Sequence, residues 1–440
     1  MNNKKWMAIL LGGIMAASLA APCSVSAAEK TTLTFWHAMG GTNGEVLQQI
    51  VDDFNASQDE IEIKAEYQGT YDDTITKLKA AMQSDSGLPD VCQMYDVGTK
   101  FMYDSGAVIP VEDKFESTGY DKSSVMEVIS SYYTVDGKQY AMPFNVSTPM
   151  LYYNKDVFEA AGLDPETPPT TYDEVLEDAK KIVESGAAPV GYSQAIYGWV
   201  FEQQLAGLGV TYGNNDNGRK EAVTAVDFDS NGGGLKVFDM WKKLYDSGYF
   251  EDYGTTTADT QTAFFSGQVG MIIESTAILK NAVDSSPFEV GTGYLPRIEQ
   301  NDEGGVIIGG GSLWLTDTGN EANEDAAWKF IEYITTPDVQ AKWSMGTGYF
   351  AINEKAYETE DMKAYLKENP NFETAINQLK DSPVNCNTAG VLSGVQTEAR
   401  LTFNEIMPQV YDGKLTTQDA VDQLAASVNK AIENYNESIK

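Results

Sequence analysis

Hydrophobic and polar positions along the chain follow two alternating periods, which predicts a regular succession of strands and helices. Residues 32–36 (TLTFW) form a short apolar run, and residues 61–67 alternate between apolar and polar. Both patterns are typical of strands. Apolar residues recur at helical spacing in 46–54 and 75–82, and residues 90–97 are again strand-like. Strands that alternate with helices predict a parallel sheet covered on both faces.

The remainder of the chain continues this pattern. Apolar residues at helical spacing predict helices at 175–183, 235–244, 327–334 and 416–432. One further strand is expected at 150–153. Thr416 and Asp419 have the spacing of a capping box, which predicts the start of the last helix. Residues 214–218 (NNDNG) and 231–234 (NGGG) are expected to be surface turns. The class is therefore α/β, and 440 residues favour two or three folding units.

Composition narrows the possible functions. The chain has 65 acidic residues against 30 Lys and Arg, which gives a net charge of −35. A field of this sign repels nucleic-acid phosphates and anionic lipid, so neither is expected as a partner. The single histidine, His37, excludes sites that need two, including multi-histidine zinc sites. We expect no metal and no cofactor.

The N-terminal segment is typical of a secretory signal. Two lysines precede an apolar run that ends in small residues, so residues 1–27 are expected to be a cleaved signal peptide. Cys23 within it raises lipid attachment as the less favoured alternative, because a proline precedes it. Export would leave Cys92 and Cys386, which either pair in an oxidising compartment or remain buried thiols. The expected location is periplasmic or extracellular.

Common catalytic motifs do not explain this chain. His37 ends a strand, and no Gly-x-Ser-x-Gly elbow exists to partner it, so a packing or rim role is favoured. There is also no phosphate-binding P-loop. Paired carboxylates for a secreted hydrolase remain open, because 65 acids form close pairs by chance.

Only three arginines are present, and each is a candidate anion ligand in so acidic a chain. Arg219 and Arg297 lie in turn-like segments and are expected at the surface. Arg400, from its own neighbours, is also favoured as a surface ion-pair residue. Residues 309–311 (GGG) offer backbone N–H groups to an oxyanion, with a tight strand-to-strand connection as the alternative.

Ligands of open α/β sheets lie beyond the carboxyl ends of the strands. The segments that follow the predicted strands are therefore the first candidates for ligand contact, and these are residues 36–41, 67–71, 95–99 and 144–149.

Several motifs together resemble a known family. They are FWHAMGG (35–41), EYQGTYDD (66–73), QMYDVGT (93–99), PFNVSTPMLYYNKD (143–156), AGLDP (161–165), FFSGQVGM (264–271), IIGGGSLW (307–314) and GTGYFAIN (346–353). In this order they resemble the extracytoplasmic solute-binding proteins of ABC importers, in the large sugar-binding class. Within that class the chain is most similar to the branch that binds glycerol 3-phosphate. FFSGQVGM is common to the whole class, whereas PFNVSTPMLYYNKD and IIGGGSLW are more specific to that branch.

The resemblance implies two lobes, each a mostly parallel sheet flanked by helices, with the ligand buried between them. Residues 29–145 and 308–365 are expected to form the N-terminal lobe, and residues 146–307 and 366–440 the C-terminal lobe. The implied protein is a monomeric receptor, not an enzyme. It closes around a solute by hinge bending and presents it to permease and ATPase subunits.

The resemblance also implies ligand contacts at the matching positions, which are Tyr71, Asp96, Ser147, Trp199, Ser275, Gly310, Tyr349 and Arg400. Arg400 would pair with a phosphate, and serine, tyrosine and glycine groups would complete the anion's hydrogen bonds. Asp96 and Tyr71 would take glycerol hydroxyls at the opposite end of the ligand.

Two departures from the family pattern leave the ligand open. Asp96 stands where the family has a glutamate, and of a tryptophan pair only Trp199 is kept, with Ile196 and Tyr197 at and beside the other position. A phosphomonoester and a diester such as glycerophosphocholine are both possible. The rivals are a neutral oligosaccharide on aromatic surfaces and, more weakly, a secreted hydrolase.

Overall fold

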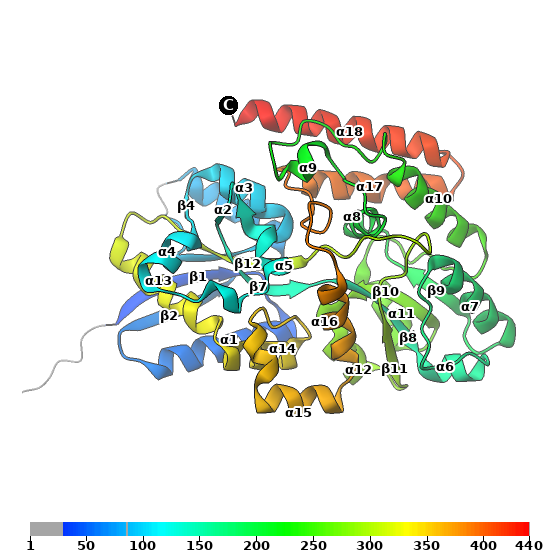
Figure 1. Cartoon of the computed structure of the whole chain (residues 1–440), viewed down its shortest axis with the longest axis horizontal. Coiled ribbons are helices and arrows are strands. Elements are labelled where there is room, and N and C mark those ends of the chain that lie inside the picture. Colours follow the sequence, from blue (N-terminus) through cyan, green and yellow to red (C-terminus); the bar gives the residue numbers. More distant parts are fainter. Residues whose placement is uncertain (1–29, 85–86, 440) are drawn as a thin grey trace, which may run out of the picture.

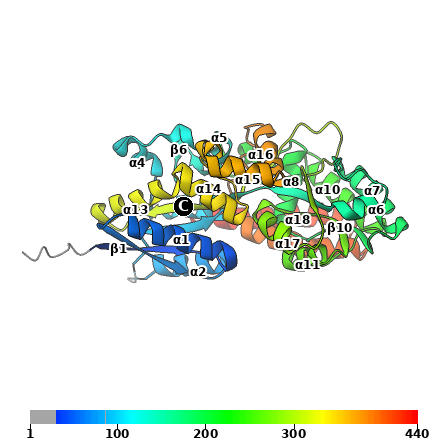
Figure 2. The ribbon, with the colours of Figure 1, turned by 90° about the horizontal axis from the view of Figure 1, so that it is seen from below.

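Two α/β halves lie side by side in the computed structural model, which describes residues 30–84 and 87–439 (Figure 1). The predicted signal peptide and Cys23 lie outside the described residues. Seen from below, the two halves follow one another along the long axis (Figure 2).

The first half is built on a mixed sheet with the strand order β2-β1-β3-β12-β4, in which β7 also pairs with β12. Its strands are β1 (Thr31–His37), β2 (Ile61–Tyr67), β3 (Val91–Tyr95), β4 (Val108–Ile109), β7 (Met142–Ser147) and β12 (Gly309–Thr316). β1 runs parallel to β2 and β3, as the sequence predicts. β12 runs antiparallel to β3, β4 and β7, because it enters this sheet from the other half of the molecule.

Helices cover both faces of this first sheet. They are α1 (Gly41–Ser57), α2 (Tyr71–Met82), α3 (Thr99–Ser105), α4 (Val111–Thr118), α5 (Glu127–Ser130), α13 (Glu321–Ile334), α14 (Pro337–Thr347) and α15 (Glu360–Glu368). In α1 the buried residues are Leu47, Ile50, Val51 and Phe54, the stripe expected from the sequence. A small hairpin of β5 (Thr134–Val135) and β6 (Lys138–Gln139) follows α5.

The second half is built on a four-stranded sheet with the order β11-β8-β10-β9. Its strands are β8 (Pro149–Asn154), β9 (Val190–Gln194), β10 (Val269–Ser275) and β11 (Val290–Gly293). Only β9 and β10 are parallel, whereas β8 is antiparallel to both β10 and β11. The expected mostly parallel arrangement therefore holds for β1–β3, while the complete sheets are mixed.

The helices of this half are α6 (Lys155–Ala160), α7 (Tyr172–Ser185), α8 (Gly198–Gly207), α9 (Asn214–Gly218), α10 (Gly233–Asp246), α11 (Thr257–Phe265), α12 (Leu279–Ser285), α16 (Asn371–Asp381), α17 (Gln396–Tyr411) and α18 (Thr417–Ser438). A second hydrophobic core contains buried residues of α6, α7, α8, α10, α17 and α18, whereas those of α11, α12 and α16 belong to the core that also includes the first sheet. The capping box at Thr416 and Asp419 is present at the start of α18. α18 then runs along the top of the molecule toward the first half (Figure 1).

The chain crosses between the two sheets at three points. Thr148 separates β7 from β8, the segment between β11 and β12 returns to the first sheet, and the stretch between α15 and α16 crosses again. Short loop segments such as these are where domain hinges are found in two-lobed proteins.

Three turn and strand predictions need correction. In the NNDNG segment, Asn217 and Gly218 are buried, because the Asn217 side chain accepts the N–H groups of Tyr212 and Gly213. In the NGGG segment, Gly233 and Gly234 are buried and begin α10. The three glycines at 309–311 are neither a connection nor a free loop but the first part of β12. In each case long-range packing decides the conformation.

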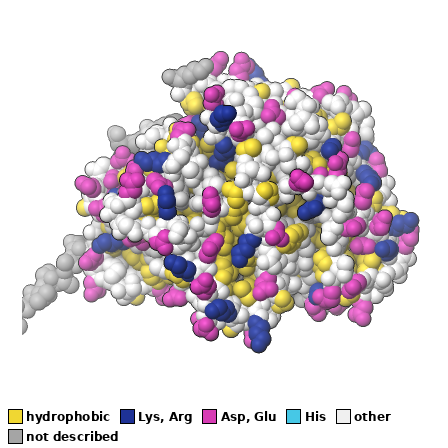
Figure 3. Space-filling view, viewed as in Figure 1, with side chains coloured by type: hydrophobic (Ala, Val, Ile, Leu, Met, Phe, Trp, Pro, Cys, Tyr) yellow, Lys and Arg dark blue, Asp and Glu magenta, His cyan; other side chains and the backbone are white. Residues whose placement is uncertain are grey.

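Charged side chains of both signs are scattered over the face shown in Figure 3, and hydrophobic side chains gather in a band between the halves. No helix within residues 30–84 and 87–439 is long and apolar enough to cross a membrane. Cys92 and Cys386 are both free thiols.

Candidate functional site

A buried ion cluster joins the two halves. Arg400, on α17, donates from Nε and Nη2 to the two carboxylate oxygens of Glu202 at 2.8 and 2.7 Å. The same Nη2 donates to Asp96 in the first half at 2.6 Å. All three side chains are less than one-tenth exposed. The expectation that Arg400 is a surface residue is therefore wrong.

The cluster carries one positive and two negative charges, so its formal net charge is −1. Burial alone would lower the pKa of Arg400, but the carboxylates of Asp96 and Glu202 outweigh burial and raise it. Burial raises the pKa of Glu202, and Arg400 opposes that shift. The guanidinium therefore remains charged. Nη1 has no hydrogen-bond partner among the described residues.

Close packing of two helices sets the position of Arg400. Gly198 begins α8, and a Cβ atom added there would lie 2.5 Å from the Cα of Arg400. The Gly198 N–H donates to Asn404, one turn further along α17, at 2.9 Å. Because only a glycine allows this approach, Glu202 on α8 can reach the Arg400 guanidinium with both oxygens.

A buried polar network in the first half orients Tyr71. Gln93 accepts the Ala38 N–H at 2.8 Å and donates to Asn145 at 2.6 Å. Asn145 in turn donates to the Tyr71 hydroxyl at 2.6 Å. Burial raises the pKa of Tyr71 well above its usual value, and the charge and hydrogen bond of Tyr349 add to this. Tyr71 and Tyr349 thus meet, and both remain protonated donors.

The glycine-rich start of β12 lies against Trp199. A Cβ at Gly309 would come within 2.9 Å of the Trp199 ring, and the Trp199 Nε1–H is buried with no hydrogen-bond partner in the described part of the chain. Gly310 has a φ of +90°, and a Cβ there would lie 1.9 Å from the Asn145 carbonyl oxygen. Glycine is therefore required at 310 for backbone conformation and for space.

The two predicted serines end strands that meet at the first crossover. Ser147 pairs with Gly309 in the sheet register, and Ser275 pairs with Pro149. The Ser275 hydroxyl accepts the Ala277 N–H at 3.1 Å. Seven of the eight predicted residues lie on or at the ends of strands and helices near the boundary between the halves, and Tyr349 lies in the segment that follows α14. Their roles in ligand binding stay predictions.

The geometry differs from the expected arrangement at Asp96. The resemblance implied that Asp96 and Arg400 lie at opposite ends of the ligand, yet they are in direct contact. The physical reason is that the two halves are close enough for the carboxylate to reach the guanidinium of the other half. Nearby, the Tyr95 hydroxyl donates to Asp72 and lies 2.8 Å from the Thr397 hydroxyl, which adds a second contact across the boundary.

Glu202 and Asn145 were missed from the sequence. Glu202 lies three residues after Trp199, a spacing that gives both residues the same helix face. It is also an acid in a helix whose residues from Gly198 to Ala206 are all buried. A buried acid needs a cationic partner, and that was the available signal. Asn145 lies within PFNVSTPMLYYNKD but was not singled out.

Arg219 also joins the halves and is half-buried, so it is more engaged than the expected surface arginine. It donates to the carbonyl oxygens of Gly390 at 2.9 Å and Tyr132 at 2.8 Å, and also to that of Ala389. Its guanidinium lies 4.9 Å from the centre of the Tyr132 ring. Burial lowers the pKa of Arg219 to about 10, since its partners are carbonyls and aromatic rings. Tyr132 belongs to the first half, and Arg219 follows α9 of the second.

We expect Arg219→Ala to lower the free energy of unfolding by about 2 kcal/mol, because three hydrogen bonds to buried carbonyls are lost. Urea unfolding followed by tryptophan fluorescence measures the change. Lys220→Ala, at the exposed neighbouring position, is the control and should change stability by less than about 0.5 kcal/mol. Equal stability of the two variants would contradict the interpretation that the Arg219 hydrogen bonds stabilise the contact between the halves.

His37 is a packed core residue, as its position at a strand end suggested. It is 6% exposed, its Nδ1 accepts the Met39 N–H at 3.3 Å, and its ring packs against Phe35 and Tyr67. Burial lowers the pKa of His37 to about 4. Its contribution to stability is complete above the unfolded-state pKa of about 6.5. It is lost as the pH falls toward 4, where the folded state also takes up the proton.

Because His37 is the only histidine, one imidazole proton signal reports it without ambiguity. We expect an NMR titration of the folded protein to show neutral imidazole down to about pH 4. A midpoint near the unperturbed value of about 6.5 would mean that the ring is solvated.

Comparisons with known proteins agree with this architecture. The family model of bacterial extracellular solute-binding proteins matches residues 49–374. The sn-glycerol-3-phosphate-binding periplasmic protein UgpB of Escherichia coli (strain K12) is 31% identical over 417 residues. The match covers 93% of this chain and 94% of that protein.

Two solved structures show the same two-lobed fold. UgpB from Mycobacterium tuberculosis, in complex with glycerophosphocholine, superposes with a TM-score of 0.79 at 20% identity, covering 92% of this chain and 99% of that one. The cyclic alpha-maltosyl-1,6-maltose binding protein from Arthrobacter globiformis gives a TM-score of 0.76 at 25% identity, covering 92% of this chain and 100% of that one.

Proposed function

Because this chain belongs to the bacterial extracellular solute-binding protein family, we propose that its solute is a glycerophosphate compound, with glycerophosphocholine favoured over glycerol 3-phosphate. Proteins of this family are non-enzymatic carriers, and they deliver small molecules to the permease and ATPase components of ABC importers. The fold alone serves many solutes, so the proposal rests on the site.

The observation that carries the proposal is the Arg400 guanidinium, which is buried at the boundary between the halves and whose Nη1 bonds to none of the described residues. A guanidinium fork fits a phosphate, and charge-assisted hydrogen bonds to it are strong in a site sheltered from water. Glu202 fixes the orientation of the fork from within the second half. The Asp96 carboxylate occupies the position that a ligand oxygen would take.

Ligand entry therefore separates Asp96 from Arg400. A phosphate oxygen replaces the Asp96 carboxylate on Nη2 or bonds Nη1, while Glu202 keeps its hold on Nε. The released Asp96 carboxylate then accepts hydroxyl groups of the glycerol, which is the role expected from the family resemblance. The bound ligand shifts the protein toward the closed state only if it binds that state more tightly.

The charge of the cluster favours a diester over a monoester. A phosphomonoester approaches a charge of −2 at neutral pH, whereas a phosphodiester carries −1. The cluster itself is at −1, so the dianion meets more repulsion. Tyr197 packs beside Trp199, with ring centroids 6.0 Å apart, and offers an aromatic face to a quaternary ammonium group. A zwitterionic diester such as glycerophosphocholine suits both the negative charge of the cluster and the aromatic face of Tyr197.

Isothermal titration of the purified protein with glycerophosphocholine, glycerol 3-phosphate and maltotriose tests the proposal. We expect micromolar binding of glycerophosphocholine, which corresponds to about −8 kcal/mol, weaker binding of glycerol 3-phosphate and none of maltotriose. Tight binding of maltotriose with no response to either phosphate would replace the proposal by an oligosaccharide receptor. Release of choline from glycerophosphocholine on incubation would instead indicate a hydrolase.

A further inference from the structure

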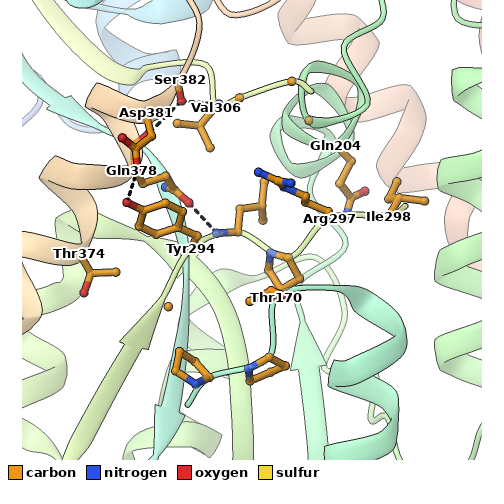
Figure 4. Close-up of a pocket in the computed structure, with 18 of the residues that line it drawn as sticks. Thr170, Gln204, Tyr294, Arg297, Ile298, Val306, Thr374, Gln378, Asp381 and Ser382 are labelled. Carbon is orange, nitrogen blue, oxygen red and sulfur yellow. Dashed lines mark hydrogen bonds between the residues drawn. The ribbon is translucent and has the colours of Figure 1, made fainter. Parts of the chain in front are cut away.

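A cavity of about 570 Å³ lies apart from the Arg400 cluster and includes none of the eight predicted site residues in its lining. Its walls come from residues 168–170 before α7, the C-terminal end of α8, the segment after β11, and α16 (Figure 4). The volume is within the range of about 300–1,000 Å³ that small-molecule sites have.

The lining combines an apolar wall with one free cation. Pro168, Pro169, Pro296 and Val306 supply apolar surface. Two backbone hydrogen bonds fix the position of Arg297. Its N–H donates to the Thr170 carbonyl at 2.9 Å, and its carbonyl accepts the Tyr172 N–H at 2.9 Å. The Arg297 guanidinium has no hydrogen bond or ion pair to a residue of the described part of the chain.

Figure 4 shows the Arg297 guanidinium in the middle of the view, with Tyr294, Gln378 and Asp381 on one side and Gln204 on the other. Two of these neighbours already accept hydrogen bonds from other groups. Asp381 accepts the Tyr294 hydroxyl at 2.8 Å, and Gln378 accepts the Leu295 N–H at 2.5 Å.

Acids elsewhere around this cavity are also engaged. Asp302 is close enough for its charge to interact with Arg297, but its carboxylate accepts the Glu299 N–H at 2.8 Å. Arg297 is exposed, as the sequence predicts, so its guanidinium is open to a ligand that enters the cavity from solvent. A guanidinium beside apolar surface is suited to a carboxylate that carries an apolar body.

We propose that this cavity is a second binding site, which takes a small organic carboxylate with its anion on Arg297 and its apolar part against the proline wall. The site is independent of the glycerophosphate proposal, because the two share no residue. The main alternative is a cationic ligand, because a cation would pair with the Asp381 carboxylate in the same cavity.

Three probes with one phenylbutyl body separate these possibilities: 4-phenylbutyrate, 4-phenylbutan-1-ol and 4-phenylbutylammonium. Binding is measured by ligand-observed NMR titration of the full chain, with excess glycerophosphocholine present. We expect the carboxylate to bind about ten-fold more tightly than the alcohol, a difference of about 1.4 kcal/mol. Tightest binding of the ammonium probe, or no measurable binding of any probe, would overturn the proposal.

Two variants localise the binding. Arg297→Ala should reduce the affinity for the carboxylate to that of the alcohol and leave the alcohol unchanged. A Cβ at Gly207 meets no atom within 4 Å, and Gly207 lines the cavity at the end of α8, so Gly207→Leu should fill it. We expect this variant to weaken both probes at least ten-fold.

Lys430→Ala, an exposed position on α18, is the control for loss of a positive charge and should bind all probes as the parent does. Melting temperatures of all variants check that each is folded. Unchanged carboxylate binding in folded Gly207→Leu would overturn the proposal. Glycerophosphocholine binding is measured in the same variant. If it is retained, the glycerophosphate site is intact, so a failure of the carboxylate-site proposal is distinguishable from a failure of the glycerophosphate proposal.

Discussion

Replacing Arg400 by methionine should weaken glycerophosphocholine binding at least about 100-fold, or about 2.8 kcal/mol, measured by isothermal titration. The substitution removes the cation that bonds Asp96 and Glu202, together with Nη1, which has no acceptor among residues 30–84 and 87–439. Truncating one member of a buried charge pair costs about 2–5 kcal/mol, much of it from the unpaired partner.

The single variant should also be less stable than the parent, since it leaves two buried carboxylates without a cation. The matched variant is therefore Arg400→Met combined with Glu202→Gln, which removes the cation and its bidentate partner together. We expect this pair to recover part of the lost stability, since only the Asp96 carboxylate then lacks a cation, but not to recover binding. A folded double variant with parental affinity would remove Arg400 from the site.

Replacing Glu202 by glutamine should change which phosphate is preferred. The cluster would move from a net charge of −1 to zero, while an amide oxygen can still accept a hydrogen bond from Arg400. At an effective dielectric constant of about 20 and a separation of about 6 Å, each unit of charge on the ligand gains about 3 kcal/mol. The dianionic monoester gains more than the diester.

The measurement is the ratio of dissociation constants for glycerol 3-phosphate and glycerophosphocholine at pH 8, where the monoester is fully charged. We expect Glu202→Gln to shift this ratio at least about ten-fold toward the monoester. Glu405→Gln, at an exposed position on α17, the helix that carries Arg400, is the control and should leave the ratio unchanged. If both variants behave alike, the charge of the cluster does not set the preference.

The spacing of apolar residues predicted helices and strands well where one face of the element is buried and the other is exposed. The stripe of α1 and the capping box of α18 are both as expected. The same patterns could not predict the direction of β12, because its partners β3 and β7 lie more than 150 residues earlier in the chain. An alternation of strands and helices suggests parallel pairing within a unit, but not the return of a strand from another unit.

The environment of Arg400 shows the same limit more sharply. Its partners lie 198 and 304 residues away in sequence, so its own neighbours gave no sign of burial. Family resemblance identified Arg400 as a candidate ligand residue, yet it did not identify Glu202. The contacts of Arg219 were missed for a similar reason, since its partners are backbone carbonyls, which carry no residue signature.

In the proposed complex, a phosphate binds the Arg400 guanidinium while Glu202 orients that side chain. A crystal structure of the complex with glycerophosphocholine tests this most directly. We predict a phosphate oxygen about 2.7–2.9 Å from Nη1 or Nη2 of Arg400, with Asp96 released and facing the glycerol hydroxyls. A ligand whose phosphate lies away from Arg400, with the contact between Asp96 and Arg400 intact, would contradict it.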